Sequence, residues 1–191
     1  MSTEHASLDG FIGDFIARQP MFFVATADVD GLVNLSPKGG EGMLRVIDAH
    51  TLAYLDLTGS TAETIAHVRA TRRITVMWCA FEGPPMIVRV HGTARIVTRA
   101  DPEWEHWAAQ FPPKVGARSV VVVTAQRISD SCGMAVPLLT YESDRQQLDG
   151  WARGKGEAGL RDYWERKNAT SLDGKPAFTV ADRGVPPTEA G

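Results

Sequence analysis

The chain has 191 residues, 43% of them hydrophobic, and a formal net charge of -3 at pH 7. This length suffices for one well-packed core with a small appendage. The slightly acidic balance lacks the broad basic field with which nucleic-acid-binding proteins attract phosphates. The longest apolar runs are also far shorter than the roughly 20 residues that span a bilayer. We therefore expect neither a nucleic-acid partner nor a membrane segment.

The two cysteines, Cys79 and Cys132, belong to no C-x-x-C pattern, which argues against a disulfide framework and favours a reducing compartment. The five histidines never fall at metal-ligand spacing, so no zinc or iron site is expected. Residues 1–10 lack the basic and apolar regions of a secretory signal. The sequence thus predicts a cytoplasmic protein without a metal.

The first predicted element is a helix that ends at Pro20. Its apolar side chains recur at helical spacing, at Leu8, Phe11, Ile12, Phe15 and Ile16. Farther along, alternating apolar residues separated by short turns predict three hairpins. These hairpins cover residues 22–36, 43–57 and 73–97.

A single helix, at residues 62–70, interrupts the predicted strands. A short tryptophan-rich helix near residues 102–111 then precedes a last strong strand at 118–128. Many strands joined by short turns favour an antiparallel barrel over alternating βαβ units. The predicted fold class is therefore mainly β, a β-barrel with flanking helices.

Composition divides the chain into three parts. Residues 1–130 carry the strands and form the predicted barrel domain. Residues 131–175 become helical and charged, so we expect them to be a C-terminal helical extension of the same domain. Residues 176–191 are rich in Gly, Pro, Ala and charge, which predicts a flexible tail.

The stretch VNLSPKGGEG, at residues 33–42, begins as a strand and then places Lys38 among a proline and three glycines. Glycine lets a backbone approach a ligand closely, and a lysine can balance the charge of a phosphate. Lys38 is either such a ligand or a solvated turn residue.

The stretch LDLTGSTAETIAHVRATRR, at residues 55–73, joins a strand end to a helix start. Ser60 and Glu63 have the S-x-x-E spacing of a capping box. The free amides of residues 59–62, together with the helix dipole, would also suit a phosphate. Against this, the Glu63 carboxylate competes for the same positive end of the helix. Lys38 would then supply the missing counter-charge.

Other candidates carry weaker signals. Arg89 and His91 alternate with valines, so they share one face of a strand, either exposed outside or used in binding. Cys132 has no neighbouring base and is expected to be structural. Trp78, Trp104 and Trp107 could form an aromatic wall or pack in the core.

The sequence contains no Ser/His/Asp, Cys/His or paired-carboxylate constellation that stands out. No catalytic residue is assigned for this reason. If the protein is an enzyme, a bound cofactor would carry its reaction.

The succession FFVATADVDGLVNLSPKGG, LAYLDLTGSTAETIAHVRATRRITVMWCAF and MIVRVHGTARIV resembles the pyridoxamine 5'-phosphate oxidase-like family of flavin-binding split β-barrels. The resemblance covers roughly residues 15–128. The later stretch SCGMAVPLLTYESDRQQLDGWARGKG is similar to a C-terminal extension in one bacterial subgroup of that family. The resemblance implies a homodimer of six-stranded antiparallel Greek-key barrels that binds FMN at the subunit interface.

The resemblance also implies the residues that hold the cofactor. Those lining the flavin and its phosphate from one strand end are Ser36, Pro37, Lys38 and Gly39. Those reaching the phosphate or the ribityl chain from the following turn and helix are Thr58, Gly59, Ser60 and Thr64. Arg89 lies on the strand that supplies a contact from the partner subunit.

The function implied is that of an FMN-dependent oxidoreductase that transfers a hydride between the flavin and a small substrate. Vitamin B6 oxidation is not expected, because Ser36 stands where pyridoxamine phosphate oxidases place an arginine. The deazaflavin F420 is an alternative cofactor. The alternative functions are a module that binds flavin, F420 or a tetrapyrrole without turnover, and a dimeric scaffold whose pocket has been lost.

Overall fold

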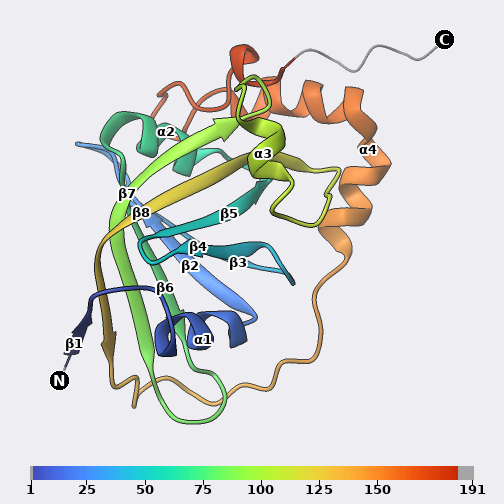
Figure 1. Cartoon of the computed structure of the whole chain (residues 1–191). Helices are drawn as coiled ribbons and strands as arrows, with labels where there is room; N and C mark the ends of the chain where they lie inside the picture. Colours follow the sequence, from blue (N-terminus) through green and yellow to red (C-terminus); the bar gives the residue numbers. More distant parts are fainter. Residues whose placement is uncertain (1, 185–191) are drawn as a thin grey trace.

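The computed structural model describes residues 2–184 and consists of one curled antiparallel sheet with helices at its ends (Figure 1). The strands are β1 (Ser2–His5), β2 (Met21–Thr26), β3 (Asn34–Gly39), β4 (Leu44–Asp48), β5 (Thr51–Leu57), β6 (Arg73–Cys79), β7 (Ile87–Thr98) and β8 (Ala117–Ser131). The helices are α1 (Phe11–Arg18), α2 (Glu63–Thr71), α3 (Trp104–Ala108) and α4 (Gln147–Tyr163), followed by the π-helix η1 (Trp164–Asn168) and the 3-10 helix η2 (Val180–Asp182). In the described part of the chain, no helix is long and apolar enough to cross a membrane.

The strand order is β3-β2-β6-β7-β8-β5-β4, and β1 adds to β8. The three hairpins predicted from the sequence are confirmed, because β2 pairs with β3, β4 with β5 and β6 with β7. The sheet has eight strands, where the hairpins and the last strand predicted seven and the resemblance implied six. One unpredicted strand, β1, is a short polar segment whose pairing with β8 leaves no periodic signal in the sequence.

Alternation along the strands separates an inner from an outer face of the sheet. One inner row runs through paired residues from the edge strand inward: Ser36, Val24, Val76, Val90 and Ile128. The four apolar members of this row are buried in the main core, together with Phe15 of α1 and Val68 of α2. The two helices therefore close the interior of the curled sheet.

Residues 176–184 differ from the flexible tail that composition predicted. Ala177 and Phe178 are fully buried, and they pack with Trp164 and Leu160 in a second apolar cluster that joins the extension to α2. Composition could not reveal this packing, since two apolar residues in a polar stretch leave no periodic signal. The remainder of the expected tail, residues 185–191, lies outside the described residues.

Candidate functional site

The edge strand β3 presents alternate residues to the interior of the sheet. Lys38 pairs with Phe22 and Ser36 with Val24, whose side chains are buried in the core, so both point inward. Pro37 and Gly39 point to the outer face, where they are exposed. Of the four β3 residues predicted to bind a ligand, two therefore lie on the inner face and two on the outer face.

Gly39 and Gly40 have structural reasons to be glycine. A Cβ at Gly39 would lie only 2.9 Å from the Pro20 carbonyl oxygen. Gly40 has a φ of +109°, which side chains rarely adopt. Close approach of the chain at Gly39 and the positive φ at Gly40 explain both residues without a ligand.

Lys38 crosses the interior toward β5, on the opposite side of the curled sheet. Its Nζ lies 3.7 Å from Asp56 Oδ1 and 5.8 Å from the centre of the Tyr54 ring. Asp56 is buried and also accepts hydrogen bonds from Arg118 Nε at 2.9 Å and Ser119 Oγ at 3.2 Å. Two cations thus share one carboxylate, which leaves one positive charge in excess.

Tyr54 lies beside this group with an unsatisfied hydroxyl. The hydroxyl oxygen is buried and has no hydrogen-bond partner among the described residues. Burial, followed by the nearby Asp56 carboxylate, raises the pKa of Tyr54 well above its usual value, although the neighbouring Thr64 hydroxyl and the charge of Arg118 act in the opposite direction. Buried polar atoms without partners are uncommon, and a ligand can satisfy them.

The turn between β5 and α2 lies next to this charge group. Arg118 donates to the carbonyl oxygen of Thr61 at 3.0 Å, and Asn168 donates to that of Gly59 at 3.1 Å. In a trans peptide, the carbonyl of one residue and the amide of the next point in opposite directions. The amides of Ser60 and Ala62 are therefore directed away from Arg118 and Asn168. Among the described residues, neither amide donates a hydrogen bond.

The predicted capping box is wrong. The residue that precedes the first turn of α2 is Ala62, and no side chain caps the helix. Glu63 is buried, where its Oε1 accepts a hydrogen bond from the Leu172 amide at 3.0 Å. The C-terminal extension thus holds the carboxylate that was expected to compete for the helix dipole, while Ser60 stays exposed.

Thr58 and Thr64, both predicted to reach a ligand, are buried and already hydrogen-bonded. The Thr58 hydroxyl donates to the Gly116 carbonyl at 2.8 Å and accepts from Trp164 Nε1 at 2.8 Å. The Thr64 hydroxyl accepts from Asn34 Nδ2 at 3.1 Å. Thr58 anchors the turn, and Thr64 helps hold β3 against α2.

Arg89 lies apart from this group. It belongs to an outer row of paired residues, which runs through Pro37, Phe23, Met77, Arg89 and Ser129. Its guanidinium donates to Ser131 Oγ at 3.1 Å. Since Arg89 and Lys38 lie on opposite faces of the sheet, they cannot contact one ligand within a single chain.

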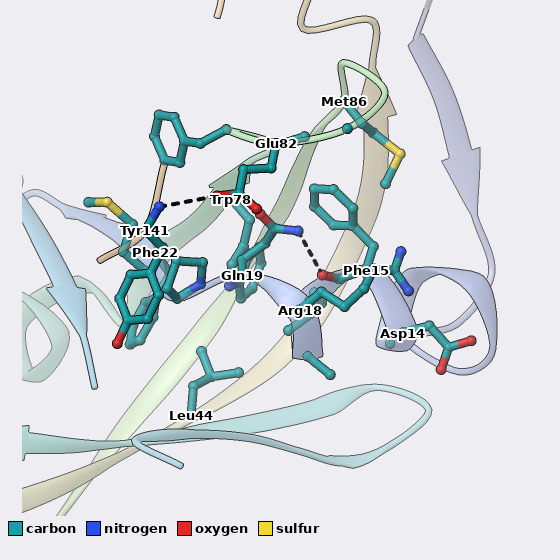
Figure 2. Close-up of a pocket in the computed structure, with 18 of the residues that line it drawn as sticks. Asp14, Phe15, Arg18, Gln19, Phe22, Leu44, Trp78, Glu82, Met86 and Tyr141 are labelled. Atoms are coloured by element: carbon teal, nitrogen blue, oxygen red, sulfur yellow. Dashed lines mark hydrogen bonds between the residues drawn. The ribbon is translucent and has the colours of Figure 1, made fainter. Parts of the chain in front are cut away.

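A hollow of about 1500 Å³ borders α1, the β6–β7 turn and Phe22, which is the strand partner of Lys38 (Figure 2). Its walls include Phe15, Phe22 and Trp78. Tyr141, on the segment that leads to α4, also lines it. The Tyr141 amide donates to Glu82 Oε1 at 3.1 Å and ties this segment to the β6–β7 turn. None of the residues predicted to bind a cofactor lines this hollow.

The tryptophans do not form the common aromatic wall considered from the sequence. Trp78 is buried in the main core, whereas Trp104 and Trp107 pack against a different apolar cluster. Both cysteines are free, with Cys79 buried and Cys132 exposed. In the described structure, no group of three or more His, Cys, Asp or Glu residues could hold a metal ion.

Sequence reasoning missed the residues that organise the site: Asp56, Arg118, Trp164 and Asn168. Asp56 had a usable signal, because it is the only charged residue in the apolar strand LAYLDL. Arg118 had one too, at the start of the run SVVVV. Asn168 had none, since it meets Gly59 across 109 residues of chain.

Comparison with known proteins decides the family. The family model described as pyridoxamine 5'-phosphate oxidase matches residues 8–132. The chain is also 35% identical over 198 residues to the pyridoxamine 5'-phosphate oxidase family protein ustO of Aspergillus flavus, which covers 94% of this chain and 79% of ustO. The chain belongs to the pyridoxamine 5'-phosphate oxidase family. The resemblance stated from the sequence is thus confirmed.

A solved structure with a TM-score above 0.5 supports the fold of this family member. A histidine-to-alanine variant of HupZ from Group A Streptococcus aligns with a TM-score of 0.53 and 24% sequence identity, over 65% of this chain and 99% of that one. HupZ itself aligns with a TM-score of 0.48 and 26% identity, over 60% of this chain and 86% of its own. The predicted fold class is confirmed as a curled antiparallel sheet with flanking helices that matches the split barrel of the family.

Proposed function

We propose that this family member is an FMN-dependent oxidoreductase that transfers a hydride between the flavin and a small organic substrate. The observation that carries the proposal is the buried charge group in which Lys38 and Arg118 share the single carboxylate of Asp56, next to the turn of residues 59–62 that Arg118 also contacts. Amides at a helix start beside a lysine suit a phosphate.

The residues present fit a phosphorylated flavin. The exposed Ser60 offers an unpaired backbone donor, Lys38 offers a counter-charge, and the Tyr54 hydroxyl is a buried polar atom still without a partner. Bound flavin would supply the hydride chemistry itself. The protein would bind the phosphate, orient the ring and exclude water. No residue is proposed as an acid or base.

The proposal includes a homodimer in which Arg89 contacts the cofactor bound mainly by the partner subunit. Its support is the outer face of the sheet, where Phe23 and Met77 are half-exposed in one row with Arg89. Leu35, at the edge of the same face, is 65% exposed. A second copy that covered these side chains would bring its Arg89 toward the open edge at β3.

The test is the colour of the purified protein and the mass of any ligand that it releases. The expected preparation is yellow, releases FMN, is bleached by NADPH without oxygen and regains its colour in air. A colourless protein that added FMN fails to stabilise against heat would contradict the proposal. Release of F420 would keep the oxidoreductase class and change the cofactor.

A second candidate is a module that binds flavin, F420 or a tetrapyrrole without turnover. The observation that favours it is that the hydroxyls of Thr58 and Thr64 are both hydrogen-bonded inside the protein. Neither hydroxyl is therefore free to contact a ligand beside the turn. A bound chromophore that no pyridine nucleotide reduces would support this candidate over the enzyme.

A further inference from the structure

The C-terminal extension contacts the carbonyl side of the turn of residues 59–62. Helix α4 and the segments after it gather beside α2 at one end of the sheet (Figure 1). Two side chains of the extension that carry polar atoms, Trp164 and Asn168, are each 0% exposed. The match to the family model ends at residue 132, so these residues lie beyond the matched region.

Asn168 joins the turn to the buried charge group. Its Nδ2 donates to the Gly59 carbonyl at 3.1 Å, and its Oδ1 accepts from Arg118 at 2.9 Å. The same arginine donates to the Thr61 carbonyl at 3.0 Å. Each polar atom of the carboxamide therefore has a defined partner, and two carbonyls of the turn are held inward.

Orientation of these carbonyls fixes the orientation of the amides that follow them. With the Gly59 carbonyl held by Asn168, the Ser60 amide must point the opposite way. Gly59 has no side chain to restrict its backbone, so this peptide group would rotate freely without its anchor. Trp164 adds a second anchor through the Thr58 hydroxyl, one residue earlier.

We infer that Asn168 is a positioning residue, which sets the turn so that its amides recognise the phosphate group of the ligand. The inference rests on the proposed function and deepens it, because it assigns the preference for a phosphorylated flavin to the C-terminal extension. An unphosphorylated flavin such as riboflavin makes no use of these amides. Its binding is therefore insensitive to Asn168.

The first experiment uses inorganic phosphate as the probe. In ¹⁵N-labelled protein, phosphate is titrated while the amide signals of Ser60 and Ala62 are followed by NMR. The variant is Asn168→Ala, and the matched control is Arg166→Ala, an exposed residue of the same π-helix. We expect saturable shifts in wild type and control, and about fivefold weaker phosphate binding in Asn168→Ala, the scale of one lost hydrogen bond.

The second experiment compares FMN with riboflavin by quenching of flavin fluorescence. We expect Asn168→Ala to weaken FMN binding by a similar factor and to leave riboflavin binding unchanged. A role confined to folding would move both affinities together. Should Asn168→Ala not fold, Trp164→Phe keeps a smaller aromatic ring, removes the donor to Thr58 and tests the second anchor of the same turn with the same two ligands.

The outcomes separate the two proposals. Equal phosphate affinity in Asn168→Ala and wild type overturns the inference, even if the protein binds FMN. Absence of a phosphate response at Ser60 and Ala62 in wild type overturns it too. A response that depends on Asn168, in a protein that binds no flavin, contradicts the proposed function and supports the inference.

Discussion

The single side chain of Lys38 lies in an environment unlike that of a surface lysine. Its ammonium lies near the buried carboxylate of Asp56 and over the Tyr54 ring. Asp56 already has Arg118 as a close partner at 2.8 Å, so it neutralises Lys38 only in part. The structure thus places Lys38 inside the curled sheet and does not support the alternative of a solvated turn residue.

Replacing Lys38 with alanine should weaken FMN binding by about 1.5–3 kcal/mol, the scale of a hydrogen bond to a charged group. The measurement is a fluorescence-quenching titration with FMN. Lys167→Ala removes the same charge from an exposed position of the extension and should leave the affinity unchanged. Equal affinity of Lys38→Ala and wild type would remove Lys38 from the site.

His91 responds to a different environment on the outer face. Burial, followed by the charges of Arg127 and Arg89, lowers the pKa of His91. Its Nδ1 is buried without a hydrogen-bond partner among the described residues. The folded protein therefore favours the neutral imidazole more than the unfolded chain does.

This difference makes stability depend on pH. The unfolded chain takes up a proton near pH 6.5, whereas folded His91 stays neutral to lower pH. The contribution of neutral His91 to the free energy of unfolding is complete above that pH. It is lost as the pH falls, because the unfolded state then binds more protons. The free energy of unfolding should thus drop less between pH 7.5 and 5.5 in His91→Gln than in wild type, by urea denaturation. His50→Gln, at an exposed position, is the control; identical slopes in all three proteins would refute the prediction.

At the scale of elements, the segment of residues 164–182 is part of the folded core. Phe178 is fully buried and meets Trp164 edge-on, with ring centroids 5.3 Å apart. Arg69 of α2 binds Asp182 of η2 through paired hydrogen bonds. The segment therefore braces the helix whose first turn lies at the candidate site.

Phe178→Ala should lower the free energy of unfolding by about 3–5 kcal/mol, the usual cost of removing a buried aromatic side chain. Thermal or urea denaturation measures the change. Val180→Ala, two residues away and 75% exposed, should have almost no effect. A loss below about 1 kcal/mol for Phe178→Ala would indicate that this segment packs less firmly than its burial implies.

How much of these elements the sequence predicts depends on how local their causes are. The hairpins and α1 follow from periodicity and turn residues within a few positions, so they were predicted. The inward direction of Lys38 follows from strand alternation once β3 is paired. The support by Asn168 and the burial of Glu63 depend on contacts across 109 residues, which leave no local signal.

At the scale of the whole molecule, the sheet is curled but not closed. In the described chain, its path ends at β3 on one side and at β4 on the other. The edge at β3 carries Pro37, which cannot donate to a further strand, and this discourages open-ended pairing between sheets. A partner would instead meet the outer face beside this edge.

We expect a dimer in solution, held through the outer face. Light scattering at micromolar concentration should give twice the chain mass of 20.8 kDa. Met77→Glu places a charge in the middle of the outer row and should shift the protein toward monomer without unfolding it. Lys167→Glu, on the exposed side of the extension, should not. A monomeric wild type would contradict the two-chain site.

The long span between Gly59 and its anchor has a consequence for the order of events during synthesis. A nascent chain can complete its sheet once β8 has left the ribosome, yet Asn168 emerges only later. Until then the Gly59 carbonyl lacks its anchor, and the neighbouring amides have no fixed direction. Under the proposed function, the phosphate-binding turn therefore reaches its final form only after the residues that follow the sheet have been synthesised.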